Sequence, residues 1–464
     1  NSSNKAEKKQ TYKKARVLTS KTAKKVVKVV EALERQKTVR VPDPDNKGKF
    51  IEKEEDDPDW AEARRILTEL LNQRAELKSY DRSVMWNYWG YIYFSDEDYD
   101  QAMYAYEQLL KEPEATIPLR TSSLLTLAQL NLVKENWDKG IRLILQWMDE
   151  VENITAQSYY LLASAYFQKE DYVRSRSSME EAIRLADEEG YRPRENWYVL
   201  LAACFNELKD RKIISAAYSL EQQLGIYEIL VNYYPKKLYF LQLGGTYQQM
   251  DREEDYMITL KAAFDKDLLD KEGEYLALAQ LLLISKNPYW AAQVLVAGQN
   301  KKVLVDNKET KKEELVPVVK DTEKNLKLLA DSWRMAQEID KAIPVLEQAA
   351  KMSKDGDTYV LLGNLYLFED RIKDSIRAIE AGLKKPKVKS RSQAQLVLGQ
   401  AHFELENFDE AKKQFRAAAR DKDKRIKKTA NSWIKYAENE EVRVKNLALR
   451  RDFIQQSQAK EKSS

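Results

Sequence analysis

Residues 80–110 read YDRSVMWNYWGYIYFSDEDYDQAMYAYEQLL, and this stretch decides the fold. Two amphipathic segments flank a polar run, SDEDYD. In the first segment the bulky Trp86 stands four residues before the small Gly90. In the second segment Ala102 stands four residues before Tyr106. Spacings of three and four residues place side chains on one face of a helix, so the stretch predicts one helical hairpin.

The pattern recurs nine times, mostly at intervals of 33 to 38 residues. The positions equivalent to Gly90 are Gly90, Ala128, Ala163, Leu201, Gly244, Ala279, Ala330, Gly363 and Gly399. A small side chain lets the second helix approach closely, and aromatic rings fill the gaps between hairpins. No such hairpin buries its apolar stripe alone. We therefore predict an all-α protein, a tetratricopeptide-like α–α superhelical solenoid of about nine to ten helical hairpins with capping helices.

Long intervals and charged ends divide the chain. Lysine-rich residues 10–36 and residues 58–78 are expected to be helices, and residues 423–456 one or two closing helices. The predicted divisions are a basic N-terminal helix and polar loop (1–57), a leading half-repeat or cap helix (58–80), repeats one to six (81–298) with an insertion near 208–226, a polar Lys-rich insertion forming a protruding loop or displaced helix (299–322), repeats seven to nine (323–420), and charged C-terminal capping helices with a tail (421–464).

Composition argues against catalysis and against nucleic acid. The net charge is only +3, without the concentrated basic face that nucleic-acid binding needs. With one histidine, His402, and one cysteine, Cys204, both at packing positions, we expect no metal site, no cofactor and no enzyme. No apolar run is long enough to span a membrane. Residues 1–55 carry sixteen Lys or Arg against eight Asp or Glu, a pointer to an acidic partner, a membrane surface or simply a solvated helix.

The first helix of each hairpin is expected to line a concave groove. Positions three before and one and four after the small residue should face inward, which gives an aromatic first half and a charged region near repeat seven. Exposed aromatic rows bind a peptide or partner helix, unless the rings bury one another. The candidate groove residues are Asn87, Tyr91, Phe94, Leu125, Gln129, Leu132, Tyr160, Phe167, Tyr198, Phe205, Lys327, Asp331 and Arg334.

From residue 60 onward the chain resembles periplasmic tetratricopeptide proteins of Gram-negative bacteria encoded beside TonB, ExbB and ExbD. The resemblance is carried by residues 80–110, 273–299 (GEYLALAQLLLISKNPYWAAQVLVAGQ), 326–351 (LKLLADSWRMAQEIDKAIPVLEQAAK) and 400–440 (QAHFELENFDEAKKQFRAAARDKDKRIKKTANSWIKYAENE). It implies a mature periplasmic scaffold, its signal peptide removed, whose protein partners include TonB, ExbB or ExbD components or an outer-membrane transporter. The alternative is a structural subunit or assembly adaptor of another envelope or cytosolic complex, bound through its convex face or insertions.

Overall fold

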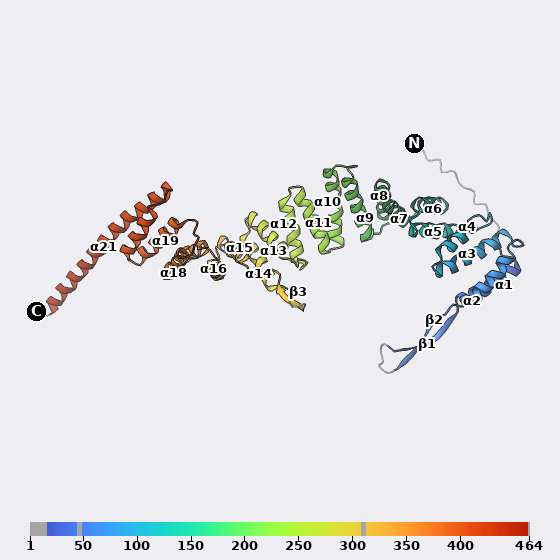
Figure 1. Cartoon of the computed structure of the whole chain (residues 1–464), viewed down its shortest axis with the longest axis horizontal. Helices are drawn as coiled ribbons and strands as arrows, with labels where there is room; N and C mark the ends of the chain where they lie inside the picture. Colours follow the sequence, from blue (N-terminus) through green and yellow to red (C-terminus); the bar gives the residue numbers. More distant parts are fainter. Residues whose placement is uncertain (1–15, 44–48, 308–311, 463–464) are drawn as a thin grey trace. The chain divides into compact units, whose positions relative to one another are not determined.

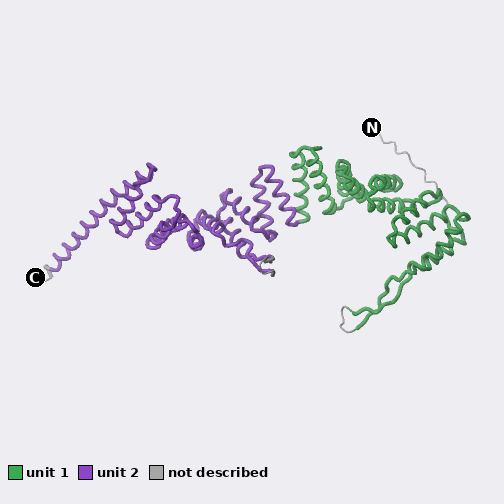
Figure 2. Tube along the Cα trace, in the orientation of Figure 1, with its two compact units in different colours: residues 1–234 green, residues 235–464 purple. Residues whose placement is uncertain are grey.

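The computed structural model describes residues 16–43, 49–307 and 312–462. Within these residues helices follow one another as packed hairpins, and two short β-ribbons are inserted among them (Figure 1). The predicted all-α fold of stacked hairpins is confirmed. The helices form two compact units, residues 1–234 and 235–464, which Figure 2 colours separately.

The first unit begins with a pair of helices and continues with four repeat hairpins, α3/α4 to α9/α10. Its elements are α1 (Ser20–Leu33), β1 (Gln36–Pro42), β2 (Phe50–Asp56), α2 (Trp60–Asn72), α3 (Ser79–Ser95), α4 (Tyr99–Leu110), α5 (Ile117–Val133), α6 (Trp137–Glu150), α7 (Ala156–Gln168), α8 (Tyr172–Glu188), α9 (Glu195–Asp210) and α10 (Ala216–Tyr233). The extra residues near 208–226 lie in the long helices α9 and α10 and the turn between them.

The second unit contains five repeat hairpins, α11/α12 to α19/α20, and a long closing helix. Its elements are α11 (Lys237–Gln249), α12 (Glu253–Asp265), α13 (Glu272–Ile284), α14 (Pro288–Asn300), β3 (Lys302–Asn307), β4 (Lys312–Pro317), α15 (Glu323–Met335), α16 (Ile339–Met352), α17 (Asp357–Phe368), α18 (Ile372–Leu383), α19 (Arg391–Glu404), α20 (Phe408–Ala418) and α21 (Lys424–Lys462).

Each of the nine repeat hairpins in the described residues turns through one non-glycine residue with a left-handed backbone. In the first hairpin, the N–H of Asp98 donates to the carbonyl of Tyr93 at 2.9 Å, across the left-handed Glu97. This bond closes the end of a helix in the Schellman motif. The left-handed residues are Glu97, Glu135, Glu170, Lys212, Asp251, Lys286, Gln337, Asp370 and Glu406, with φ between 56° and 65°.

The hairpins hold together by small residues set against large ones. A Cβ added to Gly363 would stand 2.3 Å from Ile379, and one added to Gly399 would stand 2.5 Å from the Phe415 ring. In both cases the small residue lies on the first helix of a hairpin and the large one on the second helix. The close approach that the repeat pattern predicted is therefore present in the structure.

Two pairs of strands stand where the sequence indicated a polar loop after the basic N-terminal helix and a protruding loop or displaced helix at 299–322. Residues 44–48 and 308–311 lie outside the described part. β1 pairs with β2 in antiparallel register, and β3 pairs with β4 in the same manner. In the first ribbon Lys37 stands opposite Glu55, so opposite charges face each other across the strands. Alternating β-branched residues were the missed signal.

The helices at the two ends also differ from expectation. Within the described residues the first helix spans Ser20–Leu33, so it ends before residue 36, and residues 10–15 lie outside the described part. The second begins at Trp60 and packs with α1 and α3 into one core containing Val29, Leu67 and Met85. The charged C-terminal segment is one helix, α21, of 39 residues.

Candidate partner-binding groove

The groove floor is built around the closest helix approach in the first repeat hairpin. Gly90 on α3 lies against the Tyr106 ring on α4, and a Cβ on Gly90 would stand 2.7 Å from that ring. The ring is buried, and burial raises the pKa of the Tyr106 hydroxyl to about 12. Tyr106 is the one groove residue that comes from a second helix of a hairpin.

Above this floor is a groove of about 570 Å³ within the first unit. It lies between the first helices of neighbouring hairpins, α1, α3 and α5. Its lining residues are Val30, Leu33, Glu34, Asn87, Tyr88, Tyr91, Phe94, Tyr106, Ser122, Thr126 and Gln129. Tyr91 is 47% exposed and Phe94 is 46% exposed, so their rings are available to a ligand.

The charged groups of this groove are few. Glu34 follows α1 and is the only charged residue among the lining residues. Its negative charge, together with burial as the larger cause, raises the pKa of Tyr88. The Glu34 carboxylate has no ion pair within the described residues. A positively charged group of a ligand would therefore find an unneutralised carboxylate beside aromatic rings.

Two amides stand ready to bind a peptide backbone. Asn87 on α3 and Gln129 on α5 both line the groove, and in the part of the chain that the structure describes neither side-chain amide has a hydrogen-bond partner. An amide offers both donor and acceptor, as a peptide group does. The structure thus brings together Asn87, Tyr91, Phe94 and Gln129 from the predicted set.

Tyr160 and Phe167, both half-buried on α7, pack against the neighbouring helices. The Tyr160 ring stacks on Trp197 with centroids 5.5 Å apart, and its hydroxyl accepts a hydrogen bond from Asn196 at 2.7 Å. The Phe167 ring meets Tyr172 edge-on at 5.1 Å. Through these contacts the two rings pack neighbouring helices together and are less available to a ligand.

The prediction that Tyr198 and Phe205 face a groove was wrong. Tyr198 is 6% exposed and Phe205 is 1% exposed. Tyr218 from α10 covers Phe205 edge-on at 6.2 Å, and the Arg176 guanidinium from α8 lies 5.9 Å from the ring centroid. Side chains from α8 and α10 therefore cover the Phe205 ring that the sequence pattern placed in the groove.

The remaining predicted residues lie outside the groove. Leu125 and Leu132 on α5 are half-buried, and Leu132 packs over Gly140, where an added Cβ would stand 2.6 Å away. In the second unit, the charges near repeat seven are satisfied along α15 itself. Lys327 lies 2.6 Å from Glu323, and Arg334 lies 3.2 Å from Asp331.

Several groove residues were not predicted, because the inward positions were counted from a single helix. Val30, Leu33 and Glu34 belong to α1, which the sequence presents only as a basic capping helix. Tyr88 and Thr126 each follow a predicted groove position by one residue, and Ser122 lies about one helical turn before Leu125. The amphipathic pattern of α1 was the available signal, but which repeat it packs against is a tertiary property.

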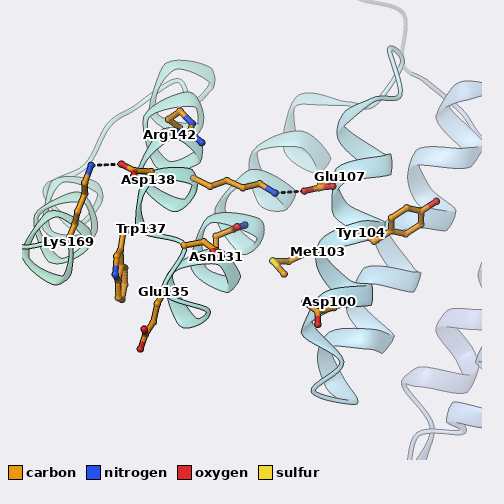
Figure 3. A pocket seen from close by; sticks show the side chains of 12 residues that line it. Asp100, Met103, Tyr104, Glu107, Asn131, Glu135, Trp137, Asp138, Arg142 and Lys169 are labelled. Atoms are coloured by element: carbon orange, nitrogen blue, oxygen red, sulfur yellow. Dashed lines mark hydrogen bonds and ion pairs between the residues drawn. The ribbon is translucent and has the colours of Figure 1, made fainter.

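A second hollow of about 640 Å³ lies on the other helices of the same unit. Figure 3 shows its lining residues from α4, α6, the end of α5 and the turns beside these helices. Its lysines are already paired, since Lys139 lies 2.6 Å from Glu107, and Lys169 pairs with Asp138 (Figure 3). These ion pairs link successive hairpins. The groove, with its half-exposed rings and unpartnered amides, is the better candidate site.

The reactive side chains have packing roles. The Cys204 thiol is buried 3.2 Å from the Ser175 hydroxyl, and burial raises its pKa to about 11. His402 is half-buried, and burial lowers the pKa of its imidazole. Among the residues that the structure describes, no group of His, Cys, Asp or Glu is arranged to hold a metal ion. No described helix is both long and apolar enough to cross a bilayer.

Comparisons with known proteins agree with the repeat architecture. Two family models, each described as the tetratricopeptide repeat, match residues 156–189 and 360–425. The first match coincides with α7 and α8, and the second runs from α17 to the start of α21. Each unit therefore contains a stretch that matches the tetratricopeptide repeat, and hairpins of the same construction recur along both units.

Solved structures with similar folds include three tetratricopeptide proteins. MamA is 19% identical, with 40% of this chain and 97% of that chain covered and a TM-score of 0.32. YrrB, titled a protein with an unusual peptide-binding site, is 14% identical over 43% and 91%, with a TM-score of 0.31. The Cut9–Hcn1 hetero-tetramer of APC/C is 14% identical over 78% and 77%, with a TM-score of 0.25. No curated protein matches the sequence.

Tetratricopeptide-repeat proteins are typically non-enzymatic scaffolds for protein–protein interaction. The class therefore directs the search for function to protein partners.

Proposed function

We propose that this scaffold binds an extended segment or helix of a partner protein in the groove between α1, α3 and α5. The observation that carries the proposal is the pair of half-exposed rings, Tyr91 and Phe94, beside the unpartnered amides of Asn87 and Gln129. Rings supply buried contact area at low entropic cost, and amides bond a peptide backbone. The unneutralised carboxylate of Glu34 favours a segment that carries Lys or Arg.

The finer proposal concerns the cell envelope. We infer that the chain works in the periplasm of a Gram-negative bacterium, in association with TonB-dependent uptake at the outer membrane. The resemblance of residues 80–110, 273–299, 326–351 and 400–440 supports this. The partners are then TonB, ExbB or ExbD components or an outer-membrane transporter. Immobilised periplasmic domains of TonB and ExbD should retain the chain, and osmotic shock should release it from cells.

The groove is tested by a double variant, Tyr91→Ala with Phe94→Ala. Partner proteins captured by the immobilised full chain should be lost from the double variant, because both rings leave the groove. Tyr104→Ala is the matched control, since Tyr104 is 51% exposed on α4 and lines the second hollow instead. Equal capture by the double variant and the wild type would exclude the groove.

The second candidate function is that of a subunit of a larger assembly, bound through the insertions of this chain. The favouring observation is the exposed apolar surface of the β3–β4 ribbon, where the paired residues Leu304 and Leu315 are each 63% exposed. An isolated two-stranded ribbon is only marginally stable in water, so its retention suggests a contact. Leu304→Thr with Leu315→Thr would abolish capture under this alternative and leave capture unchanged under the groove proposal.

A further inference from the structure

The closing helix α21 extends beyond the hairpin stack that its first part covers. Its first part packs on α20, with Ala430 and Ala437 buried around Phe415. Along the helix, the last ion pair to α20 within the described residues is that of Glu441, whose carboxylate lies 2.6 Å from Lys412. From residue 442 to 459 the side chains are exposed, apart from two that are half-buried. Figure 1 shows α21 extending beyond α19 toward the C-terminal end of the chain.

Large apolar side chains are exposed on this free part. Phe453 is 71% exposed, Leu449 is 66% exposed and Val442 is 58% exposed. Their spacings of seven and four residues set them in one stripe along the helix. Ile454 and Leu447, 46% and 38% exposed, lie about 130° further round the helix, on a separate face. A soluble surface normally scatters such residues singly, so a shared face indicates a binding surface.

This stripe does not continue the repeat stack. Ala430, Trp433 and Ala437 mark the side of α21 that packs on α20. At 3.6 residues per turn, the stripe of Leu449 and Phe453 is rotated by about 150° from that side. A further hairpin added to the stack would therefore leave this stripe uncovered. The apolar stripe must meet something else.

The charges of residues 442–459, the free part of α21, indicate the chemistry of its binding partner. Between residues 442 and 459 there are four cations, Arg443, Lys445, Arg450 and Arg451, and one anion, Asp452. Arg443 pairs with Glu440 and Lys445 pairs with Glu441 on the same helix. Arg450 and Arg451 have no ion pair within the described residues. A second copy of this helix would bring these cations against one another. An anionic occupant is complementary to them.

The cations beside the apolar stripe favour a lipid surface over a partner helix. At 3.6 residues per turn, Arg443 and Arg450 flank the stripe of Val442, Leu449 and Phe453 on one side, and Lys445 flanks it on the other. At a lipid interface the stripe enters the acyl boundary, while the stems of the flanking cations extend up to the phosphates. We propose that residues 442–459 of α21 bind the surface of an anionic lipid bilayer, lying in its plane.

The probe is a vesicle of equal parts phosphatidylcholine and phosphatidylglycerol, sedimented with the full chain. We expect the wild type to co-sediment with these vesicles and to remain in solution with phosphatidylcholine alone. Leu449→Ala with Phe453→Ala removes the stripe, and Arg450→Glu with Arg451→Glu reverses the charge. Each double variant should weaken binding by about tenfold or more. All changes lie at exposed positions, and circular dichroism checks that the helix persists.

Matched controls separate this surface from general stickiness. Phe368, at the end of α17, is 71% exposed like Phe453, and Arg425, at the start of α21, has a side chain that is 93% exposed. Phe368→Ala and Arg425→Glu should bind vesicles as the wild type does. Binding that is absent, indifferent to phosphatidylglycerol, or equally weakened by the controls would overturn the proposal. Absent binding would leave the face to an acidic partner helix. Because the groove is untouched, the outcome is independent of the proposed function.

Discussion

Gly90 on α3 and Tyr106 on α4 are in such close contact that an added methyl group would stand 2.7 Å from two carbons of the ring. We expect Gly90→Ala to lower the free energy of unfolding by up to about 2 kcal/mol, because overpacking outweighs the better helix propensity of alanine. Urea unfolding of the full chain measures this. Gly225→Ala on α10 is the control, since nothing lies within 4 Å of its added Cβ, and it should gain about 1 kcal/mol. Equal gains would contradict the packing argument.

Substitution by glycine should change the free energy of unfolding in opposite directions at a left-handed turn residue and at the helical residue before it. Gln337 has φ 62°, whereas Ala336, one residue earlier, has an ordinary helical φ of −77°. Gln337→Gly should raise the free energy of unfolding by up to about 1 kcal/mol, because glycine has no strain there. Ala336→Gly should lower it by about 1 kcal/mol. Thermal melting compares the two variants, and changes of the same sign would show that backbone strain does not control these turns.

Phe94 and Phe205 occupy equivalent positions in their repeats, but they differ in burial. Phe205→Ala should cost about 3–5 kcal/mol, because the ring is 1% exposed and a cavity would remain. Phe94→Ala, at 46% exposure, should cost less than about 1 kcal/mol. Denaturant midpoints of the two variants measure the difference. A cost for Phe94→Ala close to that of Phe205→Ala would make Phe94 a core residue and remove it from the groove.

Alkaline pH should destabilise the first unit through Cys204. Burial raises the pKa of its thiol to about 11, whereas an unfolded thiol titrates near about 8.5. The buried neutral thiol thus adds stability that is fully present below the unfolded pKa and is lost as the pH rises toward 11. We expect a fall of up to about 3 kcal/mol across this window.

Cys204→Ala should remove the part of this decline that lies below about pH 10, where tyrosines are still neutral. In the wild type, a thiol reagent at about pH 8 should label Cys204 only after denaturant is added, because the folded thiolate is scarce. Rapid labelling of the native chain would refute the buried environment.

The repeat architecture was readable from the sequence because each hairpin is local. Gly90 and Tyr106 stand sixteen residues apart, and the same small-to-large pattern recurs at Gly363 and Ile379 and at Gly399 and Phe415. Helical periodicity, the polar turns and the packing of one helix on the next all act over short distances. The sequence alone therefore determined the class of fold and the position of its hairpins.

Which side chains are exposed at the surface was decided by the tertiary structure. Whether Phe205 is buried depends on Tyr218 and Arg176, which reach it from helices on either side. Whether Tyr91 and Phe94 form a groove depends on α1 lying beside α3, and nothing in their own helix encodes that neighbour. Exposure is a property of the whole stack, since each side chain is covered by residues from other repeats. Sequence periodicity assigns a side chain to a face of its helix, and only the folded chain determines what that face meets.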